Sequence, residues 1–179
     1  MRLTSIAASM VAMIVAYLGI AGTAAAAGSS PGIKGFDITR YTGTWYEIAR
    51  LPAPFEKGLT NVTATYTPLS NGKIEVVNRG FRGSAQAAEN SIKGRAWIPD
   101  AQEPAHLKVS FFFFFAADYI VLDCDLQNYS WALVGSGDSF CWILSQTPVL
   151  DDTIYQNLIN VAAKAGYDTG KFIRVPQVW

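Results

Sequence analysis

The chain has 179 residues, no net formal charge at pH 7 and hydrophobic residues at 50% of its positions. This length fits one domain after any processing. The balanced charge, without a basic run or an arginine-rich stripe, gives no electrostatic reason to expect a nucleic-acid partner. Aromatic residues make up 13% of the chain, so they must fill either a core or an apolar pocket.

The first 27 residues differ from the rest. Arg2 is their only charge, residues 6–20 are almost wholly apolar, and four alanines follow at 24–27. This pattern predicts a secretory signal peptide over residues 1–27 and a domain over residues 28–179. A membrane anchor is the alternative, but the apolar run is short for a span of about 20 residues. We expect a periplasmic or secreted protein that is soluble after cleavage. No lipobox cysteine lies near the junction.

Residues 45–147 carry short runs of alternating apolar and polar residues. In residues 61–67, Val62, Ala64 and Tyr66 alternate with threonines, which is typical of a half-buried strand. Eight such strands separated by turn residues predict an all-β fold, either a closed antiparallel barrel or a sandwich. The expected strands are residues 45–51, 61–67, 74–78, 91–98, 107–111, 119–123, 129–135 and 140–147.

One late segment breaks this pattern. Residues 151–165 begin with two aspartates and continue with apolar residues at helical spacing, and Gly166 is a candidate stop. We expect one C-terminal helix whose apolar stripe packs on the outside of the sheet. Residues 172–175 are a candidate for a short ninth strand.

Five motifs follow one another in a fixed order before this helix. They are GTWYEIAR (43–50), FEKGL (55–59), VTATY (62–66), LKVSFF (107–112) and WILSQTP (142–148). The ordered set resembles the lipocalin family, and within it the bacterial lipocalin and apolipoprotein D branch. The resemblance runs from about residue 36 to residue 175. It implies an eight-stranded antiparallel up-and-down β-barrel with one C-terminal α-helix packed outside, which is enough to hold one small ligand.

The resemblance also implies structural roles for four residues. In the family pattern Gly43 and Trp45 form the G-x-W motif, whose Trp plugs the closed end of the barrel. Asp123 matches an Asp at the end of the sixth strand. Gln146 stands where the family has an Arg over the Trp, and this change removes a contact worth about 0.5–2 kcal/mol when desolvated. The geometry of the plug is therefore open.

Strand parity predicts which side chains face the barrel interior. Small residues among them leave volume for an apolar ligand. The alternative is a fully packed barrel, in which large side chains on the opposite strands fill the space beside the small residues. Polar side chains at such positions need partners, either a ligand head group or one another, water or the open rim. The predicted interior residues are Glu47, Ala49, Val62, Ala64, Tyr66, Ile74, Val76, Asn78, Ile92, Gly94, Ala96, Leu107, Val109, Phe111, Trp142 and Leu144.

Seven of these residues, together with Tyr119, form the predicted ligand-binding site. Phe111, Phe112, Tyr119 and Trp142 are expected as aromatic walls near the mouth. Phe55, in the loop after the first strand, is either a lid or tucked against the rim. The predicted ligand-binding residues are Tyr66, Val76, Asn78, Val109, Phe111, Tyr119, Trp142 and Leu144.

The sequence offers little support for a disulfide, a metal site or a catalytic centre. Cys124 and Cys141 fall at opposite ends of parallel strands, on the order of 20 Å apart at about 3.3 Å per residue. A disulfide needs Cα atoms within roughly 7 Å, so we predict two unpaired thiols. His106 is the sole histidine, so a metal cluster cannot be built on imidazoles. We expect no metal, no cofactor and no catalytic residue.

The resulting prediction is an exported lipocalin that binds a small hydrophobic or amphipathic ligand, a fatty acid or a lysophospholipid, in its cavity. Its role would be lipid transport, storage or envelope maintenance. The alternative is a lipid-modifying enzyme of the isomerase or de-epoxidase type, which would need a nucleophile or acid inside the pocket. A third reading is an interaction protein that dimerises through Trp97, Trp131 or Trp179. We expect a monomer or weak homodimer, with transient membrane contact as an option.

Overall fold

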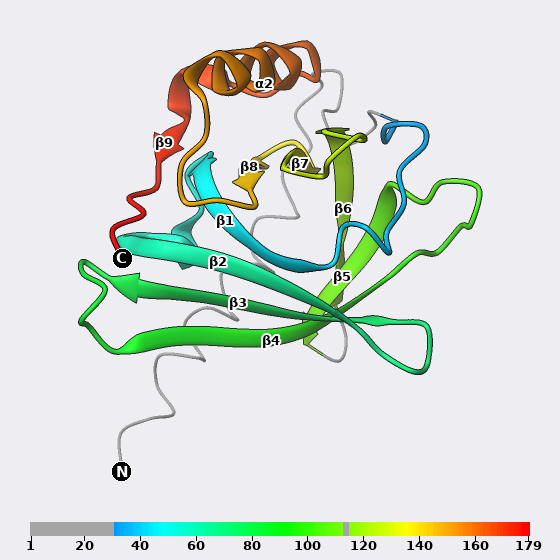
Figure 1. Cartoon of the computed structure of the whole chain (residues 1–179), viewed down its shortest axis with the longest axis horizontal. Coiled ribbons are helices and arrows are strands. Elements are labelled where there is room, and N and C mark those ends of the chain that lie inside the picture. Colours follow the sequence, from blue (N-terminus) through cyan, green and yellow to red (C-terminus); the bar gives the residue numbers. More distant parts are fainter. Residues whose placement is uncertain (1–30, 113–114) are drawn as a thin grey trace.

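The computed structural model describes residues 31–112 and 115–179; the predicted signal peptide lies outside them. In this part of the chain one antiparallel sheet curls into a barrel, and it closes because β1 pairs with both β2 and β8 (Figure 1). The eight barrel strands follow one another up and down, as predicted. They are β1 (Gly43–Arg50), β2 (Leu59–Pro68), β3 (Ile74–Arg82), β4 (Glu89–Trp97), β5 (His106–Phe112), β6 (Phe115–Cys124), β7 (Trp131–Ser136) and β8 (Phe140–Ser145).

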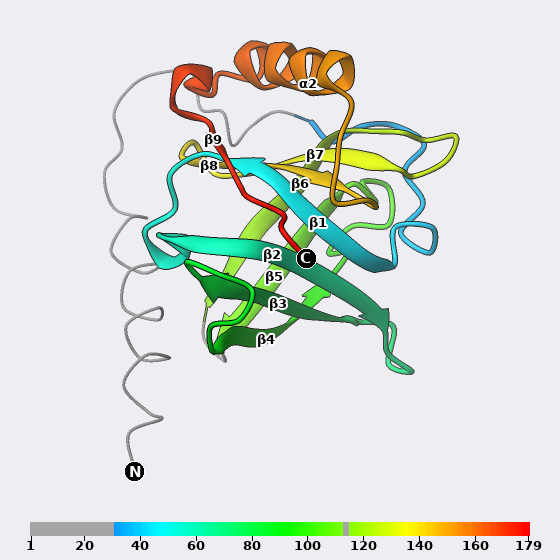
Figure 2. The ribbon, with the colours of Figure 1, turned by 60° about the vertical axis from the view of Figure 1, so that its left-hand side comes forward.

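The predicted helix is α2 (Asp152–Lys164), and it lies outside the barrel wall formed by β6 to β8 (Figure 2). Asp151 caps it by accepting hydrogen bonds from the backbone N–H groups of Thr153 and Ile154. Gly166, with φ +92°, follows its end. The predicted ninth strand is also present, as β9 (Ile173–Arg174) paired with β1. Two short 3-10 turns, η2 (Pro54–Glu56) and η3 (Thr169–Lys171), complete the described elements.

Most buried apolar side chains form two layers, one on each side of the barrel wall, and Leu59, Val62 and Val175 form a small third cluster. The interior cluster fills the barrel, and the helix-side cluster lies between the wall and α2. The interior cluster is Phe36, Tyr41, Trp45, Tyr66, Ile74, Val76, Ala96, Ala105, Leu107, Val109, Val121, Cys124, Tyr129, Ala132, Val134 and Leu144. The helix-side cluster is Ile48, Ala49, Leu51, Ile120, Leu122, Leu133, Cys141, Ile143, Leu150, Tyr155, Leu158, Ala162 and Tyr167.

A β-bulge in β1 changes which of its residues face inward. Glu47 lies opposite Leu144, but the next pair is Ala49 with Ile143, so the alternation shifts by one residue. Ala49 therefore joins the helix-side cluster, and the prediction that it faces the interior is wrong. Arg50 takes the inward position instead and is 4% exposed.

Stacked aromatic rings seal the closed end of the barrel. Trp45 is fully buried, and its indole Nε1–H donates to the carbonyl of Tyr41 at 2.8 Å. The Tyr41 ring stacks on the indole with ring centroids 4.5 Å apart. The Tyr119 hydroxyl bonds to the hydroxyls of Tyr41, at 2.8 Å, and Tyr66, at 2.7 Å. Tyr119 thus lies at the closed end with Tyr41 and Tyr66, and the prediction that it lines the mouth is wrong.

The other motif residues lie at the same end. Gln146 satisfies both ends of its amide when its oxygen accepts from Trp45 Nε1 and its nitrogen donates to the carbonyl of Thr44, each at 3.1 Å. Gly43 begins β1 opposite Tyr66. Asp123 accepts a hydrogen bond from the adjacent N–H of Cys124. The β6–β7 turn is held instead by Asp125, which accepts from Gln127, Asn128 and Ser130.

Both cysteines are unpaired, as predicted, and both are buried, Cys124 in the interior cluster and Cys141 in the helix-side cluster. Burial raises the pKa of the Cys124 thiol to about 12, and the carboxylates of Asp125 and Asp123 add to this shift. Burial also raises the pKa of Cys141. Neither thiol is therefore a reactive thiolate near neutral pH.

A thiol-reactive dye added to the native protein at pH 8 should therefore label neither cysteine on the time scale of minutes. After unfolding in guanidinium chloride without reductant, both of the chain's cysteines should react. Fast labelling of the native protein would contradict the burial. Loss of both thiols after unfolding would contradict the unpaired assignment.

Candidate ligand-binding site

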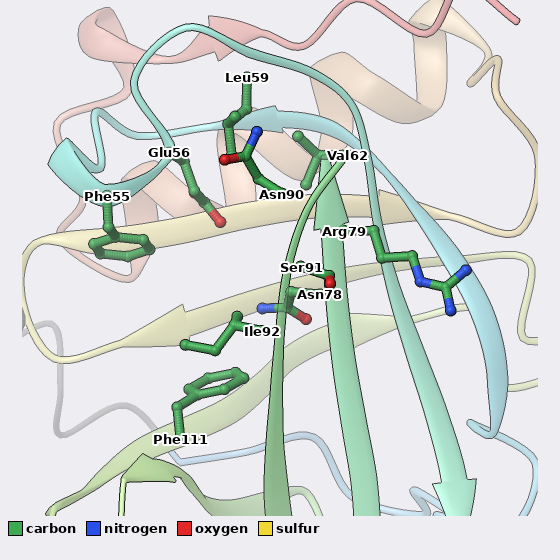
Figure 3. A pocket seen from close by; sticks show the side chains of 10 residues that line it. All are labelled: Phe55, Glu56, Leu59, Val62, Asn78, Arg79, Asn90, Ser91, Ile92 and Phe111. Atoms are coloured by element: carbon green, nitrogen blue, oxygen red, sulfur yellow. The ribbon is translucent and has the colours of Figure 1, made fainter. Parts of the chain in front are cut away.

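A small cavity opens at the end of the barrel opposite Trp45, beside η2 (Figure 3). Its volume, counted as the space open to the centres of water molecules, is about 40 Å³. The surrounding atom-free space, including the part open to solvent, is about 490 Å³. Typical small-molecule pockets hold roughly 300–1,000 Å³, so the smaller figure means that a ligand must displace side chains.

Five elements of the chain contribute the lining. Phe55 and Glu56 come from η2, Leu59 and Val62 from β2, and Phe111 from β5. The remaining lining residues are Asn78 and Arg79 from β3 and Asn90, Ser91 and Ile92 from β4. Five of the ten side chains are apolar and five are polar, which fits an amphipathic ligand better than a purely apolar one.

Phe111 explains why the cavity is small. A Cβ atom placed on Gly94 would lie 2.6 Å from Cδ1 of Phe111 and 2.7 Å from the carbonyl oxygen of Ser110. The Phe111 ring therefore occupies the space that the glycine leaves open. The prediction that small inward residues leave a free volume is wrong at Gly94, where the packed alternative holds.

A buried ionic cluster lies next to the cavity, and we call Glu47, Arg50, Glu56 and Trp142 the Arg50 cluster. Arg50 Nη1 donates to Glu47 Oε1 at 2.6 Å, and Nη2 donates to the carbonyl of Glu56 at 2.7 Å. Arg50 Nε is 3.5 Å from Glu56 Oε2, which also accepts from Trp142 Nε1 at 3.2 Å. All three charged side chains are less than a tenth exposed.

Burial sets the protonation behaviour of this cluster. It raises the pKa of Glu47 well above its ordinary value, repulsion from Glu56 adds to the shift, and Arg50 opposes both. Burial also raises the pKa of Glu56, against the attraction of Arg50 and the hydrogen bond from Trp142. One guanidinium thus faces two carboxyl groups, so the charge of the cluster depends on how many of the two are ionised.

The predicted ligand-binding residues fall into three groups. Asn78 and Phe111 line the cavity, and Trp142 reaches it through its hydrogen bond to Glu56. Tyr66 and Tyr119 lie beside the plug. The others, deeper in the interior cluster, are Val76, Val109 and Leu144.

Asn78, a predicted ligand-binding residue, has a buried side-chain oxygen that lacks a hydrogen-bond partner. Its side chain points into the cavity beside Ile92, and this oxygen is Oδ1 (Figure 3). Such atoms are rare in folded proteins and call for an explanation, a missing ligand or water among them.

Sequence reasoning missed Glu56 and Arg50 as parts of this site. Parity cannot place Glu56, because it lies in the 3-10 turn after β1, and the bulge reverses the parity of Arg50. The sequence did contain a signal for this cluster. Glu47, Arg50 and Glu56 lie within ten residues of one another, at the end of a strand that was predicted to line the barrel.

Residues 31–112 and 115–179 contain no group of three or more His, Cys, Asp or Glu side chains arranged to hold a metal. They also lack a helix long and apolar enough to cross a membrane.

A closed up-and-down barrel with one outer helix and a cavity at one end defines the class of small-ligand binding barrels. The family model described as the lipocalin-like domain matches residues 36–177. The chain therefore belongs to the lipocalin family.

Individual relatives agree with this assignment. The chain is 44% identical over 149 residues to outer membrane lipoprotein Blc of Escherichia coli K12, covering 81% of each protein. It is 36% identical over 158 residues to mouse apolipoprotein D, covering 83% of this chain and 81% of the relative. Among solved structures, insecticyanin from the tobacco hornworm Manduca sexta matches with a TM-score of 0.66 at 22% identity, over 82% of this chain and 84% of that one. The structural match shows the fold alone, while family membership supports binding of a small hydrophobic ligand.

Proposed function

We propose that the protein binds one fatty acid or lysophospholipid in its barrel and serves lipid transport, storage or envelope maintenance. The observation that carries this proposal is the cavity, with apolar walls and an unpaired buried oxygen on Asn78. Apolar walls favour an acyl chain at about 25 cal/mol per Å² of buried area, before the costs of binding. The polar residues at the same place suit a head group.

The relatives support the setting of this function. One is called an outer membrane lipoprotein and another an apolipoprotein, names that associate both with lipid. We propose that the protein acts after export, in the periplasm or outside the cell, as a monomer or weak homodimer that contacts membranes transiently.

The enzyme alternative requires an acid or nucleophile at the cavity. Glu56 lines the cavity, and its raised pKa would suit acid–base chemistry. Its carboxylate, however, is held by Arg50 and Trp142, and neither cysteine lines the cavity. Glu56 is thus engaged by other side chains, and no cysteine nucleophile faces the cavity. We therefore propose ligand binding and not catalysis.

A displacement assay tests the proposal. The fluorescent probe N-phenyl-1-naphthylamine should bind the folded protein at one site and be released by lipids with C16–C18 chains. Failure of every tested fatty acid and lysophospholipid to displace it, with the protein shown to be folded, would refute the lipid function.

Phe111 offers a sharper version of the same assay. Phe111→Ala should remove the ring that fills the space over Gly94, so lipid binding should strengthen by about tenfold, or about 1.4 kcal/mol. Phe112→Ala is the matched control, because this neighbouring ring does not line the cavity. Equal affinities for the two variants would show that Phe111 does not limit the cavity.

A further inference from the structure

The acid–base character of the cavity lining restricts the head group that it can accept. Glu56 extends from η2 toward Asn78 and Ile92 (Figure 3). Its Oε2 accepts from Trp142 and faces Arg50, whereas Oε1 receives no hydrogen bond from the described part of the chain. Oε1 is not one of the buried atoms without a partner, so it is accessible at the cavity and open to a ligand's donor.

The nearest cation is held by two buried carboxyl groups. Arg50 donates to Glu47 and to the carbonyl of Glu56, while its Nε is buried without a hydrogen-bond partner, 3.5 Å from Glu56 Oε2. It is not among the residues that line the cavity. An anionic ligand would have to compete with two buried carboxyl groups for this guanidinium.

The only cation among the lining residues that the structure describes is Arg79. Its guanidinium points away from Glu56 and Asn78 (Figure 3) and is 3.7 Å from the Glu89 carboxylate. Its side chain is 56% exposed, so water screens it. It does not supply a positive charge inside the cavity.

The neutral polar residues do not decide between ligands. Amide and hydroxyl groups, as on Asn78 and Ser91, can both donate and accept hydrogen bonds. The choice of head group therefore rests with Glu56, the one charged side chain that is both buried and part of the lining.

We propose that the cavity selects amphiphiles whose buried head group donates hydrogen bonds, a hydroxyl or an ammonium, and discriminates against a free carboxylate. This inference rests on the proposed lipid-binding function and narrows its ligand class. An ammonium has donors for both Glu56 Oε1 and Asn78 Oδ1, whereas a hydroxyl has one donor, for one of them. A carboxylate would be buried beside the Glu56 carboxyl with no cation in the buried part of the lining, which is unfavourable whenever both are ionised.

The test uses three ligands with the same C12 chain at pH 7.5: dodecylamine, dodecanol and dodecanoate. Each competes with N-phenyl-1-naphthylamine on the wild-type protein, below its micelle concentration. Dodecanoate should bind at least about tenfold more weakly than dodecanol, and dodecylamine at least as tightly as dodecanol. Residues 28–179 have 13 Lys and Arg against 14 Asp and Glu, a net formal charge of −1, so a general attraction of cations to the protein would not explain this order.

The variant Glu56→Gln should reduce dodecylamine affinity by about tenfold, strengthen dodecanoate binding and leave dodecanol nearly unchanged. Glu75→Gln is the control, since it removes the same charge from a side chain of β3 that pairs with Lys93 and does not line the cavity. It should leave the three affinities as in the wild type.

The outcomes separate the two proposals. Displacement by none of the three ligands would overturn the proposed function itself. Displacement by dodecanoate as strong as by dodecanol would overturn the head-group inference and leave lipid binding intact. If Glu56→Gln folds, as judged by near-ultraviolet circular dichroism, unchanged ratios would also overturn it. If this variant does not fold, the wild-type series decides alone.

Discussion

Replacing Arg50 by methionine is expected to lower the free energy of unfolding by about 3–5 kcal/mol. Methionine keeps most of the apolar volume of the side chain but removes its charge. Glu47 and Glu56 then remain buried without the guanidinium that both now face. Urea unfolding followed by tryptophan fluorescence measures the loss.

The loss should shrink as the pH falls from about 8 toward 5. Burial already raises the pKa of both carboxyls, and Arg50 is the group that lowers them. Without it the folded-state values rise further above those of the unfolded chain. Such groups contribute stability that is present below the unfolded pKa and is lost as the pH rises through the folded pKa. The variant should therefore recover toward the wild type in acid.

The control is the triple variant Glu47→Gln, Arg50→Met, Glu56→Gln. Because it removes all three charges together, it should recover most of the stability that the single variant loses. A single variant within about 1 kcal/mol of the wild type at pH 8, a difference typical of exposed pairs, would show that the cluster is not electrostatically buried.

Trp45→Ala is expected to destabilise the barrel by about 3–5 kcal/mol, as for other buried large aromatics. The indole is fully buried, and Tyr41 both stacks on it and accepts its hydrogen bond. Loss of the indole should also loosen the Tyr41–Tyr119–Tyr66 hydrogen-bonded chain.

Trp97→Ala is the matched control, because Trp97 is only partly buried and its main described contact is with Lys73, 5.5 Å from the ring centroid. Thermal unfolding of both variants gives the comparison. If both lose the same stability, Trp45 is not a plug of special importance.

The periodic features of this chain could be predicted from its sequence. Alternation along β2, β3 and β5 identified both the strands and their inward residues, because a strand exposes successive side chains to opposite faces. The change to helical spacing located α2, and the capping aspartate located its start. The ordered motifs were enough to predict the lipocalin barrel that the structure shows.

The failures concern places where local periodicity carries no information. The bulge in β1 moves Ala49 to the helix side and Arg50 inside, and Ile48, at the register shift between Glu47 and Ala49, does not mark it in the sequence. The fit of Phe111 over Gly94 depends on which side chains the register brings together across β4 and β5. The position of Tyr119 follows from its bonds to Tyr41 and Tyr66, which lie far from it in sequence.

The barrel fold could be predicted from the sequence, because the alternating strands, the helix, the order of the motifs and the Trp at the closed end are all visible in it. Cavity size and head-group preference, which decide what ligand the barrel can bind, follow only from the tertiary structure. Cavity size depends on the match of side-chain volumes across the barrel, and head-group preference depends on the ion pairs that form when η2 meets the end of β1. Both are contacts between residues that only closure of the barrel brings together, so a one-dimensional pattern cannot encode them.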